Sequence, residues 1–233
     1  MVGAAHLPLA SRMHNIVHPI SLERDMALVD RVKNILLSPR AEWPVIDAEP
    51  ATVASLYTGY IMPLAAIPVI CQAIGMSMVG ITIPFIGTHY RTPLVSAITS
   101  AAVMYVFSLV AVFIVAFIVD ALAPTFGGTK NQVQALKVVA YSYTASWIGG
   151  IFSLIPALGI VAVLFGLYSL YLLYLGLPVL MKSPPEKAVG YTVVVVVCTI
   201  IVTWVIFFAV AALGFGMGAG AMAGAGAGGA YRP

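Results

Sequence analysis

The sequence predicts an all-α integral membrane protein, with five transmembrane helices preceded by an amphipathic N-terminal helix. Hydrophobic residues make up 61% of the chain and charged residues only 8%, whereas soluble domains carry about 25% charged residues. No charged residue lies between Lys137 and Lys182, an interval long enough to cross a bilayer core of about 30 Å twice. Because lipid offers the backbone no hydrogen-bond partners, each lipid-exposed segment is expected to be helical.

The first part of the chain is polar enough to stay outside the bilayer. Residues 1–20 are expected to form a flexible tail. Ser21 is a suitable N-cap for a helix that ends near Leu37, before a proline. This helix is too short and too charged to span, so it is expected to lie on the membrane surface or to dock on the bundle. Its predicted apolar face consists of Leu22, Met26, Val29, Val32 and Leu36.

A connector is expected between this helix and the first span. Residues 38–50 contain three prolines, which favours an irregular segment, and they complete the amphipathic region assigned to residues 21–50. Trp43 is of the residue type that is enriched at membrane–water interfaces. The connector therefore leads along the membrane surface into a five-helix domain over residues 51–213.

The first span contains two predicted helix breaks, at Pro63 and Pro68, and its apolar character continues to Pro84. This length predicts either one kinked and tilted helix or a second short segment at the far surface. A broken helix frees backbone carbonyls that transporters use at ion sites. A kinked helix that only packs against its neighbours is the commoner case.

The second span runs from about Pro93 to Val119 and is followed by Asp120. A carboxylate at a membrane boundary can relay protons. The commoner alternatives are a solvated carboxylate and an ion pair, for which Lys130 and Lys137 are the nearest candidates in sequence.

Spans three and four are predicted to form a hairpin that turns at residues 156–159. On its first helix, Ser142, Ser146, Gly149 and Ser153 recur at helical spacing and share one face. Folding the hairpin places Ser146 near Ser169 and Gly149 near Gly166. Small residues allow helices to approach closely, and buried hydroxyls need partners.

Tyrosines on the hairpin extend this polar face. Tyr168 and Tyr171 lie too deep to be interfacial residues, so their hydroxyls are expected to reach the serine face. The pattern is compatible with helix packing and with a polar pathway through the bundle. The candidate residues for either role are Asp120, Ser142, Tyr143, Ser146, Ser153, Tyr168 and Tyr171.

Span five is expected from about Gly190 to Leu213, and a Gly/Ala-rich tail occupies residues 214–233. Within the tail, Gly216, Gly220 and Gly224 repeat every four residues, a spacing typical of a small-residue packing face. A flexible tail is the alternative interpretation.

The distribution of charge predicts the topology and limits the function. With five spans and a cytoplasmic N-terminus, nine Lys and Arg residues lie inside and two outside, which agrees with the positive-inside rule. The net charge of +3 is too small for a nucleic-acid footprint. No His-Glu-x-x-His or Gly-x-Ser-x-Gly motif occurs, so neither catalysis, a metal nor a cofactor is expected.

Four stretches of the sequence carry a family resemblance. They are R-V-K-N-I-L-L-S-P-R-A-E-W-P at 31–44, A-L-A-P-T-F-G-G at 121–128, A-L-K-V-V-A-Y-S-Y-T at 135–144 and Y-S-L-Y-L-L-Y-L-G-L-P-V-L-M at 168–181. With the order of the helices, the chain resembles the Yip domain family of Rab/Ypt-interacting membrane proteins over roughly residues 30–210. The resemblance is greatest to the bacterial inner-membrane branch of the family.

The resemblance implies a role in membrane organisation rather than enzyme chemistry. We therefore expect a non-enzymatic protein of the bacterial inner membrane that acts as an accessory or adaptor subunit. Its expected partners are membrane lipids and either further copies of itself or another membrane protein. The N-terminus is expected in the cytoplasm and the C-terminus in the periplasm. A small transporter or channel, using the broken first span and the Ser/Tyr face, is the alternative.

Overall fold

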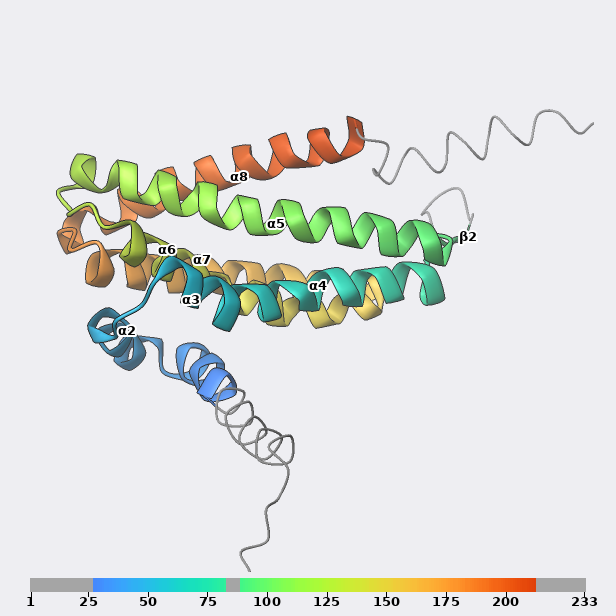
Figure 1. Cartoon of the computed structure of the whole chain (residues 1–233), viewed down its shortest axis with the longest axis horizontal. Coiled ribbons are helices and arrows are strands. Elements are labelled where there is room, and N and C mark those ends of the chain that lie inside the picture. Colours follow the sequence, from blue (N-terminus) through green and yellow to red (C-terminus); the bar gives the residue numbers. More distant parts are fainter. Residues whose placement is uncertain (1–26, 83–88, 213–233) are drawn as a thin grey trace, which may run out of the picture.

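The computed structural model of the chain describes residues 27–82 and 89–212 (Figure 1). They are helical apart from connecting turns and a short antiparallel ribbon of β1 (Ile81–Thr82) and β2 (His89–Tyr90). A helix at residues 27–37 and α2 (Pro39–Ala48) precede a bundle of five helical passes. The first pass consists of α3 (Val53–Leu56), η1 (Tyr57–Ile61), α4 (Met62–Ile74) and η2 (Gly75–Val79), and the second of α5 (Leu94–Leu122) and η3 (Ala123–Phe126). The third pass consists of α6 (Gln132–Gly149) and η4 (Gly150–Leu154). The fourth consists of η5 (Pro156–Leu158) and α7 (Gly159–Leu180), and the fifth of η6 (Pro185–Lys187) and α8 (Ala188–Ala212).

The passes alternate in direction, so their connections gather at two ends (Figure 1). One end holds α2 together with the turns at residues 123–131 and 181–187, which are joined by a bond from the Thr129 N–H to the Met181 carbonyl at 2.8 Å. We call it the charged end, because the lysines of both turns lie there. The opposite end holds η2, the β ribbon and the turn at residues 150–158.

Four of the five passes in the described part of the chain are long and apolar enough to cross a membrane. They are Val53–Val79, Leu94–Phe126, Pro156–Leu180 and Pro185–Ala212. The third pass, α6, is not among them, so the predicted number of five spans is supported for four helices only. Its sequence is less apolar, with Gln132, Gln134 and Lys137 in its first two turns, and it lies at the centre of the bundle, where 12 of its 18 residues are buried. A helix surrounded by other helices does not need a lipid-compatible surface.

The first pass is one continuous helix of 27 residues from Val53 to Val79, and no separate segment follows it before the β ribbon. The turn η1 is π-helical, and at its end the Met62 N–H bonds to the Tyr57 carbonyl five residues back. In an α-helix, a proline ring clashes with the carbonyl four residues before it. For Pro63 that carbonyl belongs to η1, whose wider π-helical turn accommodates the ring. Pro68 lies within α4, so neither predicted break ends the helix.

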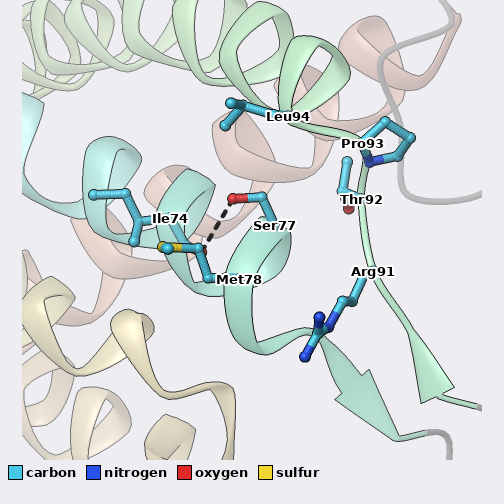
Figure 2. A pocket seen from close by; sticks show the side chains of 7 residues that line it. All are labelled: Ile74, Ser77, Met78, Arg91, Thr92, Pro93 and Leu94. Atoms are coloured by element: carbon cyan, nitrogen blue, oxygen red, sulfur yellow. Dashed lines mark hydrogen bonds between the residues drawn. The ribbon is translucent and has the colours of Figure 1, made fainter.

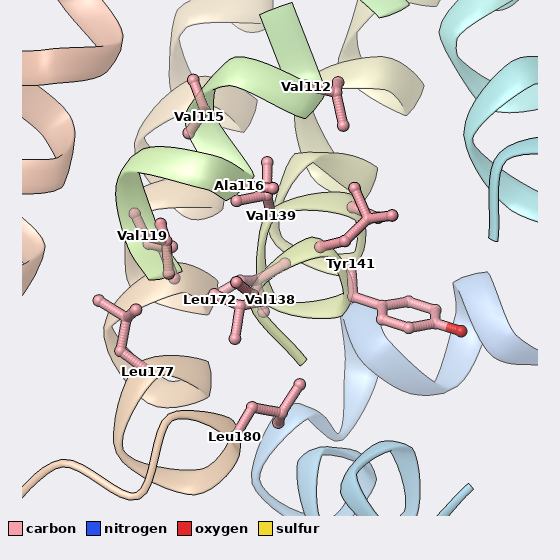
Figure 3. Packing of buried hydrophobic residues seen from close by; sticks show 14 of the residues in the cluster. Val112, Val115, Ala116, Val119, Val138, Val139, Tyr141, Leu172, Leu177 and Leu180 are labelled. Carbon is pink, nitrogen blue, oxygen red and sulfur yellow. The ribbon is translucent and has the colours of Figure 1, made fainter. Parts of the chain in front are cut away.

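The core lies where α5, α6 and α7 meet near the charged end (Figure 3). Val115 and Val119 of α5 face Val138 of α6, and Leu172 and Leu177 of α7 close the cluster. All five are 2% exposed or less. The outward faces of α5, α7 and α8 carry exposed aliphatic and aromatic side chains instead, as expected of helices that face lipid.

Candidate functional site

The N-terminal segment, residues 27–50, docks on the bundle at the charged end. Residues 38–50 were expected to be a connector, but most of them form α2, with Pro39 in its first turn. Trp43 was expected at the membrane interface, yet it is only 1% exposed. Its indole ring fills a notch on α7, where a Cβ added to Gly176 would lie 2.7 Å from the Trp43 Cζ2 atom. Bulk and backbone shape therefore fix α2 on α7.

The helix at residues 27–37 buries part of the predicted apolar face. Val32 and Leu36 pack against the core as predicted, together with Leu28. Val29, also predicted to be on this face, is 61% exposed, whereas Ile35 is fully buried. Leu22 and Met26 lie outside the described residues. This helix was expected either on the membrane surface or docked on the bundle, and its described part is docked on the bundle.

Arg31 connects this helix to α2. Its guanidinium forms ion pairs with the carboxylates of Glu42 and Glu49, which lie near the two ends of α2. Desolvation opposes the charge of Arg31, but the bonded carboxylate of Glu49 and the nearby Glu42 outweigh it, so the pKa of Arg31 is raised. The Glu42 side chain is 10% exposed, so the pair is shielded from solvent, which strengthens it and makes its disruption costly.

Side chains of the bundle hold the C-terminal end of α2. The Lys137 ammonium of α6 donates to the carbonyls of Ile46 at 2.8 Å and Glu49 at 2.5 Å. A cation at this position satisfies terminal carbonyls and complements the helix dipole. Lys182, whose backbone φ of 56° is left-handed, forms an ion pair with Asp47. Of the two lysines named as possible partners of Asp120, Lys137 is bound to α2 instead.

The polar face of α6 forms contacts between helices. As predicted, Ser146 meets Ser169: their hydroxyls lie 2.7 Å apart, and the Ser146 N–H donates to the Ser169 Oγ at 2.9 Å. Thr144 shares a hydrogen bond of 2.7 Å with the Tyr60 hydroxyl of the first pass. Tyr143 packs edge-on against Trp147 of the same helix, with ring centroids 6.0 Å apart. The hydrogen bonds join α6 to α7 and to the first pass.

Other predicted members of the polar face do not join it. Ser153 lies in η4, beyond the α-helical part of the pass. The Tyr168 hydroxyl turns away from the serines and donates to the Leu36 carbonyl at 2.7 Å. Tyr171 packs against Tyr168 with ring centroids 5.7 Å apart and is 39% exposed. Tyr168 therefore acts as a further tie to the N-terminal segment, so the prediction for its hydroxyl is wrong.

Two predicted residues have buried oxygen atoms with no partner among the described residues, Ser142 Oγ and Asp120 Oδ1. They belong to different helices, and the structure brings no group of three or more His, Cys, Asp or Glu side chains together as a metal site within residues 27–82 and 89–212. Gly149 does not meet Gly166 directly; a Cβ on it would lie 2.4 Å from the Phe165 Cβ. The predicted packing face of Gly216, Gly220 and Gly224 lies outside the described residues.

A pocket opens at the opposite end of the bundle, far from these contacts. It has a volume of about 500 Å³ and lies between the end of the first pass and the start of α5 (Figure 2). Neither Asp120 nor any residue of α6 lines it. The polar face of α6 thus has no link to this pocket.

Comparison with known proteins identifies the family of this sequence. The family model of the Yip1 domain matches residues 33–207, which is most of the chain. The chain belongs to the Yip1 domain family. It is 25% identical over 167 residues to inner membrane protein YohC of Escherichia coli strain K12, a match that covers 70% of this chain and 85% of that protein. The same protein of E. coli O6:H1 strain CFT073 matches equally, and no solved structure matches this chain.

The Yip1 domain match begins inside the docked N-terminal segment and ends within α8, so both belong to the same family unit. The contacts of Arg31, Glu42, Trp43 and Lys137 were not predicted. Each joins residues far apart in sequence, which periodicity does not reveal. One local signal was present: Trp43 and Ile46 are three residues apart, the spacing of a helix that buries one face.

Proposed function

We propose that this Yip1-domain protein is a non-catalytic component of the bacterial inner membrane that organises membrane proteins as an accessory or adaptor subunit. It assembles either with copies of itself or with a partner membrane protein. The observation that carries this proposal is the use of the α6 hydroxyls for bonds between helices, which favours a packed scaffold over a pathway. The membrane-protein relatives in E. coli support the location.

The docked N-terminal segment supports an adaptor role. It places exposed charged side chains, among them Asp30, Lys33 and Arg40, on a rigid platform at the charged end. Buried contacts of Trp43 and Arg31 hold this platform in one orientation. A fixed array of charges outside the bilayer provides orientation and specificity for a partner.

Native mass spectrometry of the full chain, released gently from its own membrane with lipids retained, tests the proposal. A stoichiometric second protein or a homo-oligomer supports it. A monomer that carries only lipid contradicts it, above all if reconstituted vesicles show solute flux that Asp120→Asn abolishes. Asp30→Asn is the matched control, because Asp30 is an exposed carboxylate outside the bundle. Flux lost in Asp120→Asn alone would support the transporter alternative.

The charged end is proposed to face the cytoplasm, with the C-terminus in the periplasm. Lys130, Lys182 and Lys187 lie in turns at this end, whereas Arg91 lies at the opposite end, a difference that matches the positive-inside rule. Single cysteines at Thr129 and Ala157, both in exposed turns, test the orientation in a background without Cys71 and Cys198. A membrane-impermeant maleimide added to intact cells should label Ala157→Cys and not Thr129→Cys; the reverse would overturn the orientation.

A further inference from the structure

The pocket at the opposite end has an apolar wall that faces the surrounding membrane. Ile74 and Met78 line it from the end of the first pass, and Leu94 lines it from the first turn of α5 (Figure 2). These side chains are 41%, 68% and 62% exposed. Because both helices are candidate membrane spans that end here, the pocket lies at the boundary between hydrocarbon and headgroups.

Arg91 places a cation at the rim of this pocket. Arg91 is exposed, and its Nε–H donates to the His89 Nε2 at 3.3 Å, which leaves the outer guanidinium N–H groups directed away from that bond. No other charged residue occurs in the connections at this end, residues 75–82, 89–93 and 150–158. A guanidinium matches the geometry of a phosphate group and binds it through paired hydrogen bonds.

The backbone adds to the positive character of the rim. The N-cap of α5 is Pro93, which makes no side-chain cap, and the first turn contains no acidic residue. The first N–H groups of a helix lack partners within the helix and carry partial positive charge. The rim therefore combines Arg91 with the positive end of a 29-residue helix, above an apolar wall.

We infer that the pocket binds one anionic phospholipid of the surrounding leaflet. The lipid phosphate contacts Arg91 and the start of α5, and an acyl chain lies along Ile74, Met78 and Leu94. The amphiphilic pattern selects this occupant, since a soluble anion would leave the apolar wall unused and a zwitterionic phospholipid would bring a positively charged headgroup next to the Arg91 guanidinium. This inference is independent of the proposed adaptor role.

Lipid retention tests the inference directly. The full chain is reconstituted in nanodiscs that contain equal amounts of phosphatidylglycerol and phosphatidylcholine, transferred to mild detergent and measured by native mass spectrometry. Wild-type protein should retain phosphatidylglycerol in preference to phosphatidylcholine. Arg91→Gln should lower retention of phosphatidylglycerol by about tenfold, the scale of one charge-assisted hydrogen bond.

Two further variants separate the contributions of the Arg91 charge, the pocket space and non-specific electrostatic attraction to lipid retention. Ser77→Phe, which adds bulk inside the pocket, should lower retention of both lipids while Arg91 stays in place. Arg40→Gln removes an exposed arginine at the charged end and should leave retention unchanged. Equal retention of the two lipids by the wild type, unchanged retention in Arg91→Gln, or an equal fall in Arg40→Gln would each overturn the inference. Thermal unfolding of each variant checks that its fold is intact.

Discussion

Gly176 is the position where one added methyl group should detach the N-terminal segment from the bundle. A Cβ at this position would lie 2.7 Å from Cζ2 and 2.8 Å from Cη2 of Trp43, whose indole is only 1% exposed. Overlap of this kind costs about 1–3 kcal/mol, whereas replacing a helical glycine by alanine gains about 1 kcal/mol. We expect Gly176→Ala to lower the free energy of unfolding by about 1 kcal/mol, the overlap cost less the gain in helix propensity, or to displace α2.

The same helix provides a matched control. Nothing lies within 4 Å of a Cβ added to Gly166, so Gly166→Ala should stabilise α7 by about 0.5–1 kcal/mol through helix propensity alone. The two substitutions are chemically identical and occur 10 residues apart on α7. Opposite signs of their effects would therefore report the contact with Trp43 and not a general property of glycine.

Docking is measured through the fluorescence of Trp43 after Trp147 and Trp204 are replaced by phenylalanine. Acrylamide should quench Trp43 weakly in the parent and strongly in Gly176→Ala, and denaturation by SDS should give the loss in stability. If Gly176→Ala were at least as stable as its parent and Trp43 remained shielded from acrylamide, the proposed packing of α2 on α7 would be refuted.

Three further substitutions test the polar contacts. Arg31→Gln leaves the Glu42 carboxylate without its partner and should lower the free energy of unfolding by about 2 kcal/mol, measured by SDS denaturation. Adding Glu42→Gln should recover part of this stability. An Arg31→Gln variant as stable as its parent would argue against the ion pair. Ser169→Ala removes both bonds to Ser146 and should cost about 1 kcal/mol by the same assay. Ser146→Ala removes only the bond between the hydroxyls and should cost less. Equal costs would contradict the geometry. Tyr168→Phe frees a carbonyl of the N-terminal helix, and limited proteolysis should cleave residues 27–37 faster than in Tyr171→Phe, whose hydroxyl makes no such bond.

The elements that could be predicted from sequence are those whose causes are local. The uncharged interval between Lys137 and Lys182 requires a hairpin, and its tight turn sets which residues face each other. The pair of Ser146 and Ser169 follows from this geometry, and the structure confirms it. Family membership was likewise predictable, because whole stretches of sequence carry it.

The docking of the N-terminal segment could not be predicted because its causes are nonlocal. Three prolines within 38–50 favour a connector on local grounds, whereas the notch at Gly176 that receives Trp43 is 133 residues away in sequence. The Tyr168 hydroxyl binds a carbonyl 132 residues away in sequence. A polar residue in an apolar run reveals that it needs a partner but not which partner it finds.

The burial of α6 has a consequence for how the chain is made. A nascent segment that carries Gln132, Gln134, Lys137 and several hydroxyls partitions poorly from the translocon into lipid by itself. Lys137 and Gln134 bond to residues of the N-terminal segment and Ser146 bonds to α7, the apolar helix that follows directly in the chain. We therefore expect α6 to be held back at the ribosome-bound channel until α7 emerges, and the two helices to enter the bilayer together.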